Sequence, residues 1–364
     1  MRLVDILKRI CLAPGVSGFE DGVRRALKEV FLEEKMRDLT VDNVGNLIVK
    51  WGKGGLKIAL MAHMDEMGIV IRDIDERGYL HFSSIGGLDR RELLGRRVVI
   101  FGNGRRLLGK KIDERKVIGV IGVKPVHLLK DEEARRIPDI KDMFIDIGAT
   151  SRKEAEEFVR IGDIGVVEKH FTVLPANEEL VSCRSLDDRA GCAAIIEVLR
   201  MLGAPGDKVV YAVFTAQEEI GARGSRVAAF TLEPHIAFIV DVTHAVGFPG
   251  LGARDYAPIE IGKGPAIAYG SPINVKLSEF LIEIAEELKV PYQIEYAAGR
   301  TGTDFDFVQI VSRGILATVV SIPLKYMHSN VEVVCISDIV NTAKLLSEAI
   351  KRLKEGDLGR FKPS

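Results

Sequence analysis

The feature that most constrains this chain is a run without charges, from Val209 to Val213, that is soon followed by two adjacent carboxylates, Glu218 and Glu219. A β-branched and aromatic run of this kind is typical of a strand buried on both faces. In open α/β sheets the carboxyl ends of such strands often carry the active site. Neighbouring side chains at a strand end point in different directions, so one glutamate could bind a metal while the other faces a substrate. Taken alone, the pair could also be a solvated turn.

Helical and strand patterns alternate from about Asp187 to the end of the chain, and the first 67 residues have a similar texture. This alternation predicts the α/β class, with a sheet flanked by helices. The spacing of Ser17 and Glu20 also predicts a capping box for a helix over about 18–32. The main expected helices are 190–202, 278–288, 304–311 and 337–353, and the main expected strands are 57–62, 209–215, 236–240, 292–296 and 315–322.

The stretch between these two parts has a different texture. Short alternating apolar runs, separated by glycines and charged turns, occupy residues 68–163. Such a pattern is typical of a small β-rich domain. We therefore expect a discontinuous α/β domain formed by residues 1–67 and 164–364, with residues 68–163 as a β-rich insert.

Charge and hydropathy exclude several classes of partner. Lysine and arginine number 51 against 52 aspartates and glutamates, which gives a net charge of -1. A balance so close to zero argues against nucleic acid or an anionic membrane as the main partner. No apolar run approaches the ~20 residues of a membrane span. The first ten residues read as an amphipathic helix with interleaved charges, not as a signal peptide.

Four cysteines occur in apolar segments without CxxC spacing, at Cys11, Cys183, Cys192 and Cys335. Their number and placement do not suit a disulfide framework in so long a chain. Small buried residues in a reducing cytosol fit better. We therefore expect a cytoplasmic protein.

Metal-capable side chains gather at five places where an apolar run ends or a short loop follows it. The five are His63-Met64-Asp65, Asp187-Asp188-Arg189, Glu218-Glu219, Asp241-Val242-Thr243-His244 and Tyr326-Met327-His328-Ser329. A mixture of imidazole and carboxylate favours zinc, cobalt or manganese over calcium or magnesium. A two-ion site needs one carboxylate shared by both ions, and a further acidic group to take a proton from the attacking water. Glu218 and Glu219 could each take one of the tasks of ligand and proton acceptor.

These five stretches, in this order and at this spacing, resemble the M42 family of metallo-aminopeptidases, which includes the tetrahedral TET peptidases and proteins once labelled endoglucanase M. The resemblance extends over nearly the whole chain. It implies two divalent ions, zinc or cobalt. One would be held by His63 and Asp241, the other by Glu219 and His328, with Asp187 bridging the two.

The same resemblance implies roles for three further carboxylates. Glu218 would be the general base, and Asp65 would orient His63. Asp188 would shape the loop beside Asp187 rather than bind metal. Peptides would be the substrates, with cleavage confined to their amino terminus.

The resemblance also implies a fold and an assembly. The insert would be PDZ-like and would help dimers to build a dodecamer. One departure concerns the loop before Asp304, where relatives have two glycines before the Thr-Asp pair. Here Thr301 precedes Gly302 and Thr303, so the departure falls in the substrate-side loop and does not touch the metal ligands.

Two other functions would fit parts of the same pattern. A metal-dependent deacylase or an endoglucanase-like hydrolase would keep the metals but change the substrate. A non-catalytic assembly protein would leave Glu218, beside Glu219, without a role, because structural metal sites rarely keep a spare base. Residues 104–111 have the spacing of a phosphate-binding loop as far as Lys110, but Lys111 replaces the expected serine or threonine, so a basic hairpin is favoured.

Overall fold

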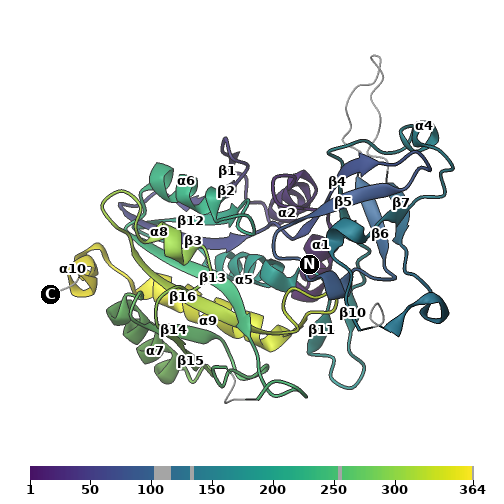
Figure 1. Ribbon diagram of the computed structural model, residues 1–364. Helices are drawn as coiled ribbons and strands as arrows, with labels where there is room; N and C mark the ends of the chain where they lie inside the picture. Colours follow the sequence, from purple (N-terminus) through teal and green to yellow (C-terminus); the bar gives the residue numbers. More distant parts are fainter. Residues whose placement is uncertain (102–115, 132–134, 253–255, 363–364) are drawn as a thin grey trace. The chain divides into compact units, whose positions relative to one another are not determined.

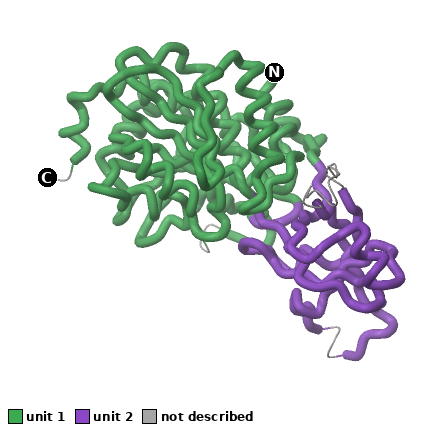
Figure 2. Tube along the Cα trace, turned by 90° about the horizontal axis from the view of Figure 1, so that it is seen from above, with its two compact units in different colours: residues 1–65, 171–327, 331–364 green, residues 66–170, 328–330 purple. Residues whose placement is uncertain are grey.

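The computed structural model describes residues 1–101, 116–131, 135–252 and 256–362. It divides the chain into two compact units (Figures 1 and 2). The first unit contains residues 1–65, 171–327 and 331–364, and the second contains residues 66–170 and 328–330. The first unit has the mixed α/β fold that the alternation of elements predicts.

Eleven strands within the described residues form one mixed sheet in the first unit. Nine of them lie in the order β1-β2-β12-β3-β13-β16-β17-β11-β10, while β14 pairs with β16 and β15 with β14. Their bounds are β1 Leu39–Val41, β2 Leu47–Gly52, β3 Leu56–His63, β10 Thr172–Val173, β11 Leu180–Ser182, β12 Lys208–Thr215, β13 Ile236–His244, β14 Ala266–Gly270, β15 Gln293–Ala297, β16 Leu316–Lys325 and β17 Val333–Cys335.

The central strands β12, β3, β13 and β16 run parallel to their neighbours in this set, so their carboxyl ends meet at one edge of the sheet. Thr215 of β12 pairs with His63 of β3. On the other side of β3, Ile239 of β13 pairs with Met61. Asp241 lies two residues after Ile239 on β13, and His63 lies two residues after Met61 on β3. The register thus brings three of the five predicted stretches to the same edge of the sheet.

Helices cover both faces of this sheet (Figure 1). Successive residues of β3 enter different clusters: Ile58 and Leu60 pack with α1, α2, α5 and α9, whereas Ala59 and Met61 pack with α6 and α8. This double burial explains why the strands contain hardly any charges. The helices are α1 Leu3–Leu12, α2 Asp21–Glu33, α5 Leu186–Leu202, α6 Arg223–Leu232, α7 Val275–Leu288, α8 Phe305–Val308, α9 Ile336–Arg352 and α10 Leu358–Phe361.

The second unit is β-rich, and six of its strands close into a barrel in the order β4-β5-β8-β7-β6-β9. It has its own apolar core, in which Ile71, Phe82 and Ile100 are buried. The strands are β4 Gly68–Ile74, β5 Leu80–Ile85, β6 Arg97–Phe101, β7 Lys116–Ile121, β8 Ile145–Asp146 and β9 Ile164–Val167, and a short helix, α4, spans Arg152–Ala155. The likeness of this unit to a PDZ domain remains a prediction.

The predicted capping box at Ser17 and Glu20 is wrong. Helix α2 begins at Asp21, and Glu20 occupies its N-cap position without a hydrogen bond from its own side chain to the helix. The Ser17 hydroxyl instead donates to Asp65. The basic segment 104–111 lies outside the described residues. Among the residues that are described, no helix is both long and apolar enough to cross a membrane.

The core of the first unit gives a test of the fold. Phe214 of β12 is fully buried, and its ring centroid lies 5.3 Å from that of Phe31. We expect Phe214→Ala to lower the free energy of unfolding by about 3–5 kcal/mol, because a buried aromatic ring leaves a cavity. Phe230→Ala is the matched control, since Phe230 on α6 is 67% exposed. Equal effects of the two variants in denaturant unfolding would contradict this packing.

Candidate metal centre

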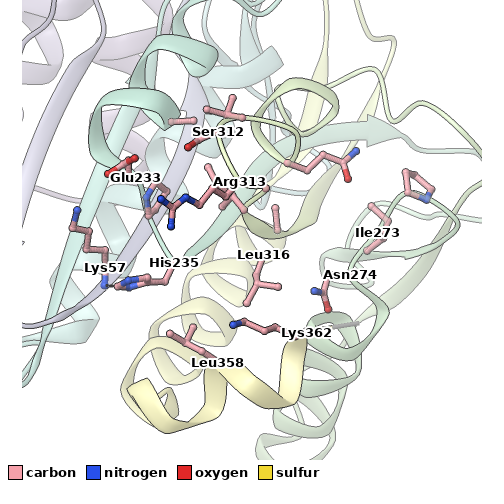
Figure 3. A pocket seen from close by; sticks show the side chains of 18 residues that line it. Lys57, Glu233, His235, Ile273, Asn274, Ser312, Arg313, Leu316, Leu358 and Lys362 are labelled. Carbon is pink, nitrogen blue, oxygen red and sulfur yellow. Dashed lines mark hydrogen bonds between the residues drawn. The ribbon is translucent and has the colours of Figure 1, made fainter. Parts of the chain in front are cut away.

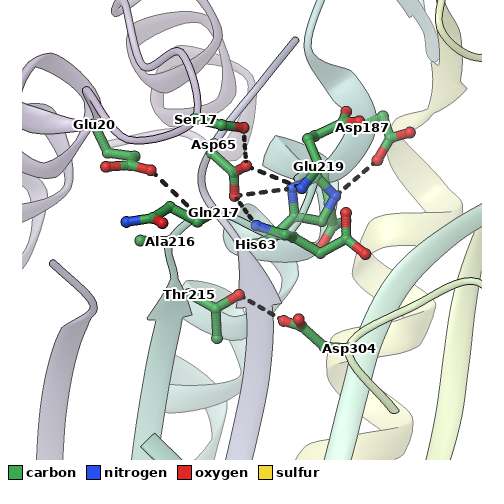
Figure 4. Close-up of polar contacts among 12 residues, drawn as sticks. Ser17, Glu20, His63, Asp65, Asp187, Thr215, Ala216, Gln217, Glu219 and Asp304 are labelled. Atoms are coloured by element: carbon green, nitrogen blue, oxygen red, sulfur yellow. Dashed lines mark hydrogen bonds and ion pairs between the residues drawn. The ribbon is translucent and has the colours of Figure 1, made fainter. Parts of the chain in front are cut away.

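Three of the predicted ligands come together at the carboxyl edge of the sheet. One ligand atom from each of His63, Asp187 and Asp241 lies within 4.8 Å of the other two. His63 Nε2 and Asp187 Oδ1 are 2.9 Å apart (Figure 4). All three side chains are buried. His63 ends β3 and Asp241 lies near the end of β13, whereas Asp187 reaches the site from the start of α5.

The start of α5 is irregular where it carries its two aspartates. Asp187 and Asp188 have non-helical backbone angles, and a cis peptide bond joins them. Asp188 is fully buried, and its Oδ1 accepts the amide of Gly191 at 2.9 Å. A Cβ atom on Gly191 would come within 2.4 Å of that oxygen, so this turn requires glycine. Asp188 therefore fixes the entry into the helix through its own hydrogen bond.

The two adjacent glutamates lie in the loop that follows β12. Both are half-buried, and a Glu219 oxygen lies within 4.8 Å of an Asp187 oxygen. Their backbone amides donate to the two carboxylate oxygens of Asp65, at 3.0 Å for Glu218 and 3.1 Å for Glu219. Asp65 Oδ1 is 3.7 Å from His63 Nδ1, which is too long for a good hydrogen bond. Asp65 thus contacts the glutamate loop more closely than the imidazole, and its role toward His63 remains a prediction.

His328 follows β16 by three residues. Its side chain is half-buried, and its backbone has a φ of 62°. A Cβ atom on Gly87 would lie 3.3 Å from His328 Nδ1. Its role as a metal ligand remains a prediction.

The buried carboxyl groups strongly perturb one another. Burial raises the pKa of Glu218 to about 10. The charge of His63 opposes this rise, and the negative charges of Asp304, Asp241 and Asp65 add to it. Burial also raises the pKa of Asp188 and of Asp241 well above the usual range for aspartate. Carboxylates in such a place need positive charge nearby if they are to be ionised together.

A divalent cation would supply that charge, and the donor set fits one. Burial alone would lower the pKa of His63, but the carboxylates of Asp187 and Asp65 raise it well above its ordinary value. An imidazole so placed among carboxylates is equally suited to a cation shared with them. Imidazole nitrogen and carboxylate oxygen are the ligands that zinc, cobalt and manganese accept. The residues of this site therefore fit the metals that the sequence predicts.

Two buried carboxylates near the centre were not identified as site residues from the sequence. Glu332 is 1% exposed, and its Oε2 accepts the backbone amide of Asp187 at 3.3 Å. Asp304 is 1% exposed and accepts the hydroxyl of Thr215, the last residue of β12, at 2.6 Å. Both pairings join segments far apart in the sequence, so no local pattern indicates them.

The loop that departs from the family pattern has a structural explanation. The Thr301 amide and hydroxyl both donate to Asp306 Oδ1, at 2.9 Å and 3.0 Å. The amide of Gly302 donates to the other oxygen of Asp306 at 3.1 Å. Thr301 thus adds a hydrogen bond to a turn that is closed by Asp306 and leads directly to Asp304.

A cavity of about 1050 Å³ lies at the opposite edge of the sheet (Figure 3). Its lining includes Lys57 and Leu316, at the starts of β3 and β16, and His235, which precedes β13. His235 Nδ1 accepts the Lys57 amide at 3.0 Å, which is a structural role. The predicted catalytic and metal-binding residues do not line this cavity, so its size does not make it the catalytic site.

Comparison with known proteins agrees with this geometry. The family model described as M42 glutamyl aminopeptidase matches residues 45–345. The chain is 36% identical to the lysyl aminopeptidase of Pyrococcus furiosus over 359 residues, which cover 97% of this chain and 98% of the relative.

Solved structures give the same result. An aminopeptidase from the archaeon Desulfurococcus kamchatkensis superposes with a TM-score of 0.88 at 33% identity, covering 100% of this chain and 98% of the other. The TET1 peptidase of Pyrococcus horikoshii, described as able to assemble into a tetrahedron or a large octahedral shell, gives 0.81 at 33% identity, covering 97% and 100%.

Removal of the shared carboxylate tests the metal centre. We expect Asp187→Ala to bind fewer divalent ions per chain than the parent protein after loading with zinc or cobalt, because Asp187 lies beside both His63 and Glu219. Elemental analysis after dialysis measures this. Asp338→Ala is the matched control, since Asp338 is also a buried carboxylate but holds the amides of Gly262 and Gly264. Full metal content in Asp187→Ala would contradict the assignment.

Proposed function

Because the chain belongs to the M42 family of aminopeptidases, we propose that Glu218 is the general base of a centre that hydrolyses peptides with the help of two divalent metal ions. The observation that carries the proposal is the gathering of His63, Asp187 and Asp241 beside the adjacent pair Glu218 and Glu219. Burying several carboxylates together at one sheet edge is unfavourable unless positive charge compensates them, and a cation would supply that charge. The aminopeptidase names of the relatives favour peptides over the glycosidase and deacylase alternatives.

The residues would divide into ligands and a base. His63 and Asp241 would hold one ion, Glu219 and His328 the other, and Asp187 would contact both. Glu219 lies within reach of Asp187 and supports this division. His328 is assigned from its place in the sequence motif. When bound, the ions would polarise the scissile carbonyl and lower the pKa of the attacking water.

Glu218 would carry the proton. Its carboxyl is half-buried among other acidic groups, and its high pKa there indicates a strong affinity for protons. With the positive charge of the ions nearby, the carboxylate would be ionised and able to accept a proton from the attacking water. It would then give that proton to the leaving amine. The acidic surroundings would also attract the positively charged amino terminus of a peptide.

The division of labour between the two glutamates is testable. Glu218→Gln retains size and hydrogen bonding but cannot accept a proton, so we expect kcat to fall by at least ~10²–10⁴ while both ions stay bound. Glu219→Gln should weaken one metal site instead, so that excess zinc or cobalt partly restores activity. Metal content and kcat, measured side by side on both variants, show which glutamate is the base and which is the metal ligand. A fully metallated, active Glu218→Gln enzyme would refute the proposal.

We propose further that the second unit carries contacts between copies of the chain. Exposed apolar side chains gather on β7 and the segment after it: Ile118, Val120, Val123, Val126 and Leu128 are each at least 45% exposed. Apolar patches of this kind commonly mark protein interfaces. The named assemblies of the Pyrococcus horikoshii relative support a homo-oligomer. A dodecamer built from dimers is the specific form that we propose, as the sequence resemblance implies.

We also propose a cytoplasmic location for the protein. The four cysteines are free and buried, which suits a reducing compartment.

Light scattering tests the assembly. The intact protein should have a mass many times that of one 40.0 kDa chain. Paired Val126→Lys and Leu128→Lys substitutions should yield smaller species, because burying two ammonium groups in an interface is unfavourable. Leu288→Lys, at an exposed position on α7, serves as the control. A monomeric parent protein, or an unchanged mass in the double variant, would exclude this surface.

A further inference from the structure

The first four residues of the loop after β12 are held by side chains, among them Glu20 and Asp65 (Figure 4). Four consecutive backbone amides, those of residues 216 to 219, each donate to a side-chain oxygen from another part of the chain. The acceptors, in the order of the amides, are Asn46 at 2.9 Å, Glu20 at 3.2 Å, and the two oxygens of Asp65 at 3.0 Å and 3.1 Å.

The carbonyl groups of the same loop are also engaged. The carbonyl oxygen of Ala216 accepts the amide of Gly224, that of Gln217 accepts the amide of Arg223, and that of Glu218 accepts two amides further on. Gln217 has a left-handed backbone, with a φ of 61°. Residues other than glycine adopt this conformation at a cost of about 1 kcal/mol or more, so surrounding contacts must hold it.

Glu20 is the contact at that left-handed residue. Its side chain is 3% exposed, and Oε1 accepts the amide of Gly18 at 2.6 Å as well as that of Gln217. Its other oxygen, Oε2, lies 3.6 Å from Arg24 Nη2. Arg24 in turn donates through Nε to the carbonyl oxygen of Gly45 at 2.8 Å. Arg24 thus holds the Glu20 carboxylate through the oxygen that does not contact the loop.

The orientation of Glu20 is unusual for its position. A side chain at an N-cap ordinarily accepts an amide from the first turn of its own helix. Glu20 makes no such bond and is turned toward the loop that carries the two glutamates. Ser17, from the same short segment, donates to Asp65 and so supports the next two amides of that loop.

We propose that Glu20 is a positioning residue for catalysis, which holds the Gln217 peptide and thereby fixes the carboxylate of Glu218 relative to the substrate. The inference rests on the proposed role of Glu218 as general base. Glu20 accepts the amide of Gln217, one residue before Glu218, while Asp65 accepts the amides of Glu218 and Glu219 themselves. Loss of Glu20 releases the left-handed Gln217 that leads into Glu218, while the amides of both glutamates stay tethered through Asp65.

Three substitutions at Glu20 test this role. Glu20→Ala removes the acceptor, and we expect kcat to fall about 10–100-fold, the scale for a misplaced catalytic group. KM and metal content should stay close to the parent values. Glu20→Gln keeps an oxygen that can accept the Gln217 amide, so kcat should remain within about 3-fold of the parent. Glu20→Asp keeps the charge but withdraws the oxygen, and should resemble Glu20→Ala even if the alanine variant folds poorly.

Two further variants separate this role from general destabilisation and from the proposed function. Asp338→Ala removes a buried carboxylate that also accepts two backbone amides, and it should lower the melting temperature without lowering kcat at temperatures where it is folded. Parent-like kcat in Glu20→Ala, or equal losses in Glu20→Gln and Glu20→Ala, would overturn the positioning role. Equal losses in Asp338→Ala would overturn it as well. Activity in Glu218→Gln would refute the general base itself, whatever the Glu20 variants show.

Discussion

The site depends on one carboxylate that accepts two neighbouring backbone amides. Asp65 receives the amides of Glu218 and Glu219, one on each oxygen. Charge-assisted bonds of this kind are stronger than those between neutral groups. The pairing joins the end of β3 to the loop after β12, two elements that lie side by side through parallel pairing. The direction in which each glutamate points therefore depends on the sheet register and on the side chains that hold the loop backbone, among which Asp65 holds two amides.

The same edge of the sheet concentrates negative charge. Burial among other carboxylates raises the pKa of Asp188, Asp241 and Glu218, so these groups cannot all ionise without a source of positive charge. Apolar residues of similar volume would stabilise the folded state at least as well as such a cluster of buried charges. Its presence at the carboxyl ends of parallel strands, where ligands bind in this class of sheet, connects the architecture to hydrolysis.

Much of this arrangement could be predicted from local sequence. The charge-free runs predict β3, β12 and β13, because these strands are buried on both faces, and His63 and Asp241 follow from where the runs end. The roles of Glu20 and Asn46 could not be predicted in this way. Their partners Gln217 and Ala216 lie 197 and 170 residues further along the chain. The capping-box spacing at Ser17 was misleading because both of its side chains are used in tertiary contacts.

Anomalous diffraction from cobalt-loaded crystals, recorded at the cobalt absorption edge, tests the central claim most directly. The account predicts two peaks per chain, about 3.5–4 Å apart, with Asp187 in contact with both. One peak should touch His63 and Asp241, the other should touch Glu219, and the carboxylate of Glu218 should bind neither. A single peak, or a peak bound by Glu218, would contradict a two-ion centre in which Glu218 is reserved for proton transfer.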